Sequence, residues 1–208
     1  MIVLIFVFLA FIYSVILHEL AHGWVADRLG DPTARLSGRL TLDPRSHIDP
    51  IMSIALPLVL AILGMPIFGA AKPVPVDPFN FREGRKDMAI VALSGPATNI
   101  LIAAFFGLLL RLFGIVIINP QVESLLSEVC LLSIRLNLFL AFFNLIPLPP
   151  LDGYRVVAGV LPKELALFWA SLERFGFWLI FLVIFFFGNI ISLFVSPLVA
   201  FFYRLFVG

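Results

Sequence analysis

Two histidines and a glutamate near the amino terminus have a spacing that suits metal chemistry. The residues His-Glu-Leu-Ala-His at positions 18–22 have the pattern H-E-x-x-H. On a helix, side chains four residues apart lie on the same face, so the imidazoles of His18 and His22 can bind one Zn²⁺ ion. Glu19 lies one residue further round, where it can accept a proton from a water beside the metal. We therefore predict metal-assisted hydrolysis with Glu19 as the general base.

The composition indicates a membrane protein. Of the 208 residues, 62% are hydrophobic and 23 are Phe, whereas soluble globular chains have about 45–50% apolar residues. A membrane-spanning helix needs about 20 mostly apolar residues, so the chain has room for a few spans and short loops. The formal net charge of +1 gives no electrostatic reason to expect nucleic acid as a partner. The single cysteine, Cys130, lies in an apolar run and predicts only a small buried side chain.

Apolar segments predict the helices that position the motif. They cover approximately residues 2–26, 51–71, 88–110, 129–146 and 175–202. The first is expected to be a retained span, because it lacks the basic start and the cleavage site of a signal peptide. The second contains prolines and glycines, which favour a re-entrant or half-buried segment. We predict an all-α integral membrane protein with about four transmembrane helices, this re-entrant segment, and short extended or β pieces.

We expect one membrane-embedded domain over residues 1–208, with a catalytic core at about 1–160 and a helical region at about 161–208. Basic residues predict its orientation. Three loops, at 27–49, 72–87 and 152–174, contain most of the Lys and Arg, whereas the loop at 111–128 has one basic residue. The positive-inside rule places the first three loops in the cytoplasm and the fourth outside. The metal site is therefore expected toward the cytoplasmic face.

A catalytic zinc usually has three protein ligands and a water, so a third ligand is expected at the depth of the histidines. The fourth apolar segment runs in the same direction as the first, and Asp152 follows at its end. We predict Asp152 as the third ligand, with Gly153 letting the chain turn away. His47 is a weaker candidate in an interfacial turn. The other acidic candidates for the third ligand are Glu83, Glu123, Glu128, Glu164 and Glu173.

Three motifs occur in order along these segments. They are His-Glu-Leu-Ala-His in the first, Gly-Pro-Ala-Thr-Asn at 95–99 opening the third, and Asn144 followed by Leu-Asp-Gly at 151–153 closing the fourth. Together with Lys-Pro-Val-Pro at 72–75 and His-Ile-Asp-Pro at 47–50, they resemble the site-2 proteases, a family of intramembrane zinc metalloproteases. The resemblance covers approximately residues 10–160 and is closest to small bacterial members without PDZ or CBS domains.

The resemblance implies one zinc ion per chain, with His18, His22 and Asp152 as ligands. It also implies that Asn144 lies near the site and binds the substrate or the oxyanion, and that Asn99 caps or braces backbone there. Helix packing alone is the competing interpretation for both asparagines. The family further implies a bacterial cell membrane and a transmembrane protein or peptide as substrate.

We therefore predict hydrolysis of a peptide bond in or beside a substrate's transmembrane segment. A helical substrate must unwind locally, and an extended edge at Thr33–Leu42 or Lys72–Asp77 could hold the unwound strand by β-addition. Two alternatives stay open. One is another class of membrane zinc protease with a glutamate as third ligand, and the other is a metal transporter or a non-proteolytic zinc-binding membrane protein. A transporter would carry ligands along several spans, whereas the polar residues here lie at one depth.

Overall fold

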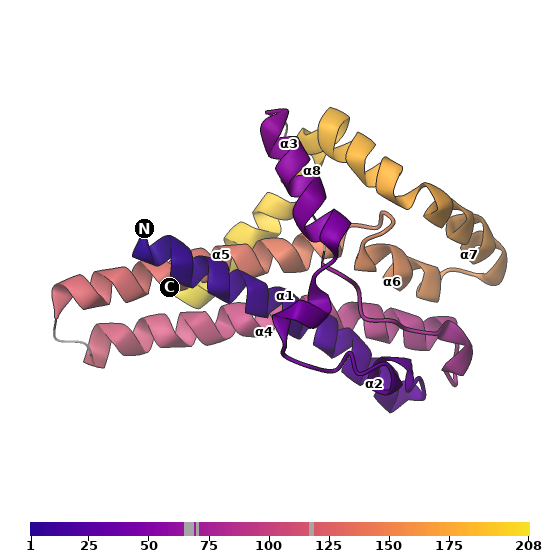
Figure 1. The fold of residues 1–208 in the computed structure, drawn as a ribbon, viewed down its shortest axis with the longest axis horizontal. Coiled ribbons are helices and arrows are strands. Elements are labelled where there is room, and N and C mark those ends of the chain that lie inside the picture. Colours follow the sequence, from indigo (N-terminus) through magenta and orange to yellow (C-terminus); the bar gives the residue numbers. More distant parts are fainter. Residues whose placement is uncertain (65–68, 70, 117–118) are drawn as a thin grey trace.

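A computed structural model describes residues 1–64, 69, 71–116 and 119–208, and these form a helical bundle (Figure 1). The α-helices are α1 (Ile2–Leu29), α2 (Thr33–Leu36), α3 (Leu56–Ile62), α4 (Arg85–Val116), α5 (Pro120–Asn144), α6 (Asp152–Val160), α7 (Lys163–Ala170) and α8 (Gly176–Val207). Short 3₁₀ turns cover Pro44–His47, Pro78–Asn80 and Ser171–Phe175, and a π turn covers Pro50–Ala55. The described part contains no β-strand.

Within the described part of the chain, three helices are long and apolar enough to cross a membrane. They are α1 with 28 residues, α4 with 32 and α5 with 25, and each exceeds the roughly 20 residues that the hydrocarbon core requires. This confirms the all-α, membrane-like class. A fourth span in α8 stays a prediction, as does the exact number of crossings.

Two helices extend further than the apolar pattern predicted. The predicted loop at 111–128 is wrong for most of its length, because α4 continues to Val116 and α5 begins at Pro120. The side chain of Asn119 accepts hydrogen bonds from the backbone amides of Gln121 and Val122 and so caps α5. Asn at the N-cap with Pro directly after it is a strong helix-start signal, and it precedes the apolar run.

The second apolar segment leaves the bundle. Its chain turns at Pro50–Ala55 and continues as α3, which points away from α1, α4 and α5 in Figure 1. Part of the predicted segment, at 65–68 and 70, lies outside the described residues. Whether this segment is re-entrant therefore stays a prediction.

The predicted extended pieces are only partly observed. Thr33–Leu36 forms the short helix α2, so the extended conformation predicted there is wrong for those residues. Residues 72–77 have no helical or strand pattern. They run as a single extended stretch. The amide of Lys72 donates to the carbonyl of His47, the last residue of the 3₁₀ turn at Pro44–His47, at 2.9 Å.

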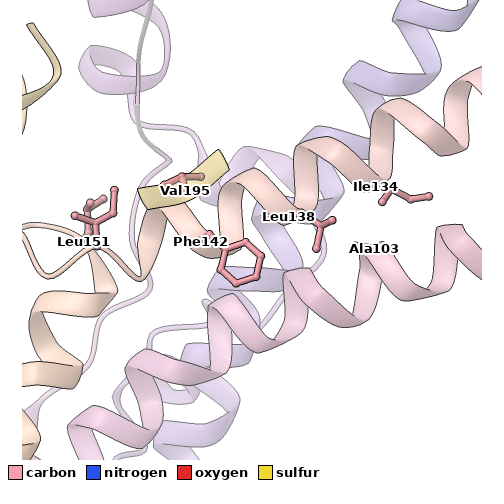
Figure 2. Packing of buried hydrophobic residues seen from close by; sticks show 7 residues of the cluster. Ala103, Ile134, Leu138, Phe142, Leu151 and Val195 are labelled. Atoms are coloured by element: carbon pink, nitrogen blue, oxygen red, sulfur yellow. The ribbon is translucent and has the colours of Figure 1, made fainter. Parts of the chain in front are cut away.

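The hydrophobic core lies where α4, α5 and α8 meet (Figure 2). Its buried members are Ala103, Ile134, Leu138, Phe142, Ile146, Leu151 and Val195. Leu151 directly precedes Asp152, and Ile146 lies in the same loop between α5 and α6. Between helices in a membrane, such packing is stabilised by van der Waals contacts between the side chains. The core therefore fixes the loop that carries Asp152.

Helix α6 is held from two sides. Gly159 lies so close to α4 that a Cβ atom there would come within 2.8 Å of the carbonyl oxygen of Arg85. On the other side, the Tyr154 hydroxyl donates to the carbonyl of Trp169 at 2.7 Å, and the Trp169 ring nitrogen donates back to the carbonyl of Tyr154 at 3.0 Å. These contacts give the first turn of α6 a defined position against the bundle.

Candidate metal centre

Three buried side chains meet between α1 and α6. His18 and His22 lie one turn apart on α1, and Asp152 is the first residue of α6. The Nε2 atoms of the two histidines are 3.0 Å apart. Asp152 Oδ2 lies 3.1 Å from His18 Nε2 and 3.3 Å from His22 Nε2. Each of the three residues is less than a tenth exposed.

This triangle of donor atoms fits a zinc ion. Zinc bonds to nitrogen and oxygen are about 2.0–2.2 Å long, and a tetrahedral site then separates neighbouring ligand atoms by about 3.3–3.5 Å. The observed separations of 3.0–3.3 Å are within a few tenths of that range. Among the described residues, this is the one group of three His, Cys, Asp or Glu side chains whose ligand atoms converge. Two nitrogens and one carboxylate oxygen form a donor set that zinc accepts.

The carboxyl group of Asp152 is suited to bind a cation. Its Oδ2 atom faces the Nε2 atoms of both histidines, and a carboxylate binds a metal in its deprotonated form.

Both histidine rings are oriented by acceptors behind them. The Nδ1 atom of His18 lies 2.5 Å from Oδ1 of Asn99, and the Nδ1 atom of His22 lies 2.7 Å from the carbonyl oxygen of Val91. Because a carbonyl oxygen only accepts, each Nδ1 carries the proton and donates it. The lone pairs of both Nε2 atoms are then free for the metal, as expected for ligating histidines whose other nitrogen is held by an outer partner.

Gly95 on α4 leaves the space that the site needs. A Cβ atom at this position would lie 2.5 Å from Nε2 of His18 and 2.5 Å from Nε2 of His22. Both distances are shorter than any normal contact. Glycine is therefore required for the approach of α4 to the two ligand nitrogens.

Glu19 contacts the extended stretch that follows α3. Its side chain is half-buried, and its Oε2 atom accepts a hydrogen bond from the backbone amide of Val74 at 2.8 Å. Arg39 holds the same stretch by donating to the carbonyls of Lys72 at 3.0 Å and Pro73 at 3.3 Å. The backbone of this stretch therefore holds the carboxylate of Glu19 in place.

The other predicted residues differ in where they lie. Asn99 contacts the ring of His18, a predicted ligand, so it braces a side chain where a backbone contact was predicted. Asn144 donates to the carbonyl of Leu140 on its own helix at 2.9 Å, and its predicted contact with substrate stays a prediction. His47 donates from Nε2 to the carbonyl of Thr41 at 2.8 Å and does not join the ligand group. The acidic alternatives Glu83, Glu123, Glu128, Glu164 and Glu173 also lie outside this group.

Two details around Asp152 correct the sequence prediction. Asp152 does not end the helix of the fourth segment, because α5 stops at Asn144 and a turn of seven residues precedes α6. Gly153 does not turn the chain away either. It lies in the first turn of α6, where a side chain would collide with the carbonyl oxygen of Leu145. The glycine is explained by this close approach of the preceding loop.

One buried polar residue near the site was missed. Asn137, in the middle of α5, is fully buried and accepts a hydrogen bond from Asn99 at 3.0 Å. The available signal was its position, since a polar side chain inside an apolar span suggests a role in the protein interior. Its partner is 38 residues away, so spacing could not have identified it.

Comparisons with known proteins find relatives that are named zinc metalloproteases. The chain is 39% identical over 178 residues to the Bacillus subtilis (strain 168) protein named "Putative zinc metalloprotease YwhC", covering 84% of this chain and 77% of that protein. It is 32% identical over 185 residues to the Mycobacterium tuberculosis (strain H37Rv) protein named "Putative zinc metalloprotease Rip2", covering 88% and 67%. Neither a protein-family model nor a solved structure matches the chain. The chain therefore belongs to this family of zinc metalloproteases.

Proposed function

We propose that the protein is an intramembrane zinc protease of the site-2 class, which hydrolyses peptide bonds in or beside transmembrane segments of membrane proteins. One observation carries the proposal: the nitrogens of His18 and His22 and an oxygen of Asp152 converge between helices that are apolar enough to lie in a membrane. One zinc ion per chain would be held by these three atoms. Relatives that are named zinc metalloproteases support the same chemistry.

Glu19 is the proposed general base. It follows His18 directly on α1, and the amide of Val74 keeps its carboxylate oriented. When bound, zinc would polarise the scissile carbonyl and make a nearby water more acidic. Glu19 takes the proton from that water and passes it to the leaving amine.

The substrate must present an unwound peptide bond. A transmembrane helix satisfies its own amides and carbonyls, so the scissile bond becomes accessible only after local unwinding. The extended stretch at 72–77 lies over Glu19 through Val74, which makes it the proposed edge for an unwound substrate strand. Pro73 and Pro75 have no amide hydrogen, so pairing along this stretch would use mainly its carbonyl groups.

The proposed orientation places the active site toward the cytoplasmic side of a bacterial cell membrane. The helices α2, α6 and α7 and the start of α4 lie toward the right in Figure 1, and these elements contain the basic residues Arg35, Arg85, Arg155 and Lys163. The amino terminus and the start of α5 lie at the opposite end. The positive-inside rule then puts the right end in the cytoplasm, and the two relatives described above are bacterial proteins.

Purified protein in detergent, incubated with a panel of single-span peptides with and without a zinc chelator, tests the proposal. We expect cleavage within or at the edge of the apolar segment, abolished by the chelator and restored by added zinc. Zinc binding without cleavage across a broad panel would instead indicate a non-proteolytic zinc-binding protein or a metal transporter. Cleavage that is insensitive to the chelator would contradict the zinc mechanism.

A further inference from the structure

A line of hydrogen bonds runs from the metal centre into the middle of α5. Oδ1 of Asn99 faces the ring of His18, and Nδ2 of Asn99 donates to Oδ1 of Asn137 at 3.0 Å. Nδ2 of Asn137 in turn donates to the backbone carbonyl of Ser133 at 2.9 Å. Both asparagines are 0% exposed. The line therefore connects α1, α4 and α5 within the protein interior.

The last acceptor in this line decides the direction of every bond before it. The carbonyl oxygen of Ser133 can only accept, so Asn137 must turn its amino group toward Ser133 and its oxygen toward Asn99. Asn99 must then donate with its amino group and face His18 with its oxygen. An oxygen opposite Nδ1 requires that His18 carry its proton on Nδ1. The ring nitrogen left without a proton is Nε2, which lies at the metal centre.

We propose that Asn137 is a positioning residue for the zinc centre, which fixes the orientation of the Asn99 amide and thereby the ring nitrogen that His18 presents to the metal. This inference rests on the proposed zinc site. Without Asn137, the amide of Asn99 is free to turn, and its amino group then faces Nδ1 of His18. That arrangement favours the tautomer of His18 with its proton on Nε2. This proton must leave Nε2 before the metal can bind there.

The other histidine needs no such device. Nδ1 of His22 faces the backbone carbonyl of Val91, whose orientation is fixed by α4 itself. A side-chain amide such as that of Asn99 presents either an oxygen or an amino group after half a turn, so it needs a further partner. This difference explains why a second buried asparagine lies behind one ligand and not behind the other.

The chain offers a matched control for packing effects. Asn144 is on the same helix as Asn137 and makes the same kind of bond, from Nδ2 to the carbonyl four residues before it, at 2.9 Å. No bond from Asn144 to Asn99 is among its described contacts. We expect Asn137→Leu to weaken zinc binding about 10- to 100-fold, the usual effect of losing an outer partner of a ligand. Asn144→Leu should leave the zinc affinity within about twofold.

Ring protons give a readout that packing does not affect. The chain has three histidines, so zinc-free protein labelled with ¹⁵N at histidine rings, held at a pH where the rings are neutral, gives few signals, and His47→Gln assigns one of them. We expect the His18 ring to carry its proton on Nδ1, and that proton to become faster-exchanging or absent in Asn137→Leu. The Nδ1 proton of His22 should be unchanged in the same sample. Neither measurement depends on proteolysis, so failure here is distinct from failure of the proposed function.

A conservative variant separates orientation from stability. In Asn137→Asp, a carboxyl oxygen still accepts from the Asn99 amino group, so zinc affinity and the Nδ1 proton of His18 should be retained. The proposal would be overturned if folded Asn137→Leu kept its full zinc affinity. It would also be overturned if Asn137→Asp and Asn137→Leu lost zinc affinity equally. Should Asn137→Leu fail to fold, the unmodified protein still decides, because a proton on Nε2 of His18 contradicts the proposed direction of the bonds.

Discussion

The carboxylate of Glu19 accepts a hydrogen bond from the backbone amide of Val74, 2.8 Å away and 55 residues later in the chain. The contact joins α1 to the extended stretch at 72–77. Gly23, one turn after Glu19, allows the approach, because a Cβ atom there would lie 2.8 Å from a methyl group of Val74. The proposed general base and the proposed substrate edge are therefore one structural unit.

Removing the acceptor should free this amide. In Glu19→Ala we expect the Val74 amide to exchange with deuterium about 10- to 100-fold faster, because a hydrogen bond to a charged group contributes about 1.5–3 kcal/mol. Glu19→Gln keeps a carbonyl oxygen and should retain most of the protection. Hydrogen exchange with mass spectrometry provides the measurement, with Glu164→Ala on the exposed face of α7 as the control. Equal exchange in Glu19→Ala and the unmodified protein would show that the contact does not form in solution.

Adding one methyl group at Gly95 should abolish metal binding. Its Cβ atom would lie 2.5 Å from both ligand nitrogens, so Gly95→Ala either occupies the space of the metal or displaces α4. We expect no zinc in the purified variant by atomic emission. Gly114→Ala on the same helix is the matched control, since the nearest atom to its Cβ would be 3.8 Å away, and it should bind zinc normally. A Gly95→Ala protein with a full complement of zinc would contradict the geometry described above.

The part of the site on α1 could be predicted from the sequence, because the H-E-x-x-H pattern and the helix that carries it are local. Asp152 could be predicted from the depth of the fourth segment and from the resemblance of its Leu-Asp-Gly motif. Asn99 on α4 was predicted to lie near the site, but its contact with the ring of His18 was not predicted. Asn137 was missed, because its only relation to Asn99 is a contact between two helices.

The extents of the helices were predicted less well, for a related reason. Apolar runs mark the part of a helix that can lie in lipid, whereas α4 continues beyond it to Val116 and α5 begins before it, at Pro120 with Asn119 as its cap. The start of α6 at Asp152 depends on packing of the preceding loop against α4, α5 and α8. Local sequence contains no record of such packing, so the position of Asp152 on a new helix could not be read from it.

Neutralising the third ligand should remove zinc without unfolding the bundle. Asp152→Asn keeps the shape of the side chain but loses the anionic oxygen that faces both histidines at 3.1 and 3.3 Å. We expect zinc affinity to fall by more than the roughly 10- to 100-fold effect of an outer partner. Competition with a fluorescent chelator measures it. Glu123→Gln and Glu164→Gln should bind zinc as the unmodified protein does, and a larger loss in either would instead favour a glutamate as the third ligand.

Asp31 should make stability depend on pH. It is fully buried and accepts hydrogen bonds from the amide of Asp77 at 2.7 Å and the side chain of Asn80 at 2.8 Å. Burial raises the pKa of its carboxyl, but these bonds and those from Thr33 outweigh burial and lower the pKa from 3.8. A lowered pKa in the folded state means that the stabilisation is complete above the unfolded value and is lost as the pH falls through the folded value.

We therefore expect Asp31→Asn to lower the melting temperature in detergent at pH 7, by loss of about 1.5–3 kcal/mol in total, because Asn keeps one acceptor oxygen but loses the charge. The difference between variant and unmodified protein should shrink below about pH 4. Thermal unfolding followed by circular dichroism at several pH values gives the comparison, with Glu164→Gln as an exposed control. A difference that is constant from pH 7 to pH 3 would show that the charge of Asp31 is not involved.

Proteolysis by the Glu19→Gln variant tests most directly whether the H-E-x-x-H helix performs zinc-dependent hydrolysis in the membrane. The variant keeps the three atoms of the metal centre and loses only the proposed base. Its zinc content and its cleavage of a single-span substrate in lipid nanodiscs are measured side by side with the unmodified protein. We expect one zinc per chain in both proteins, cleavage near the apolar segment by the unmodified protein, and at least a hundredfold slower cleavage by the variant, as is typical for loss of general-base catalysis. Undiminished cleavage by zinc-loaded Glu19→Gln would contradict this mechanism.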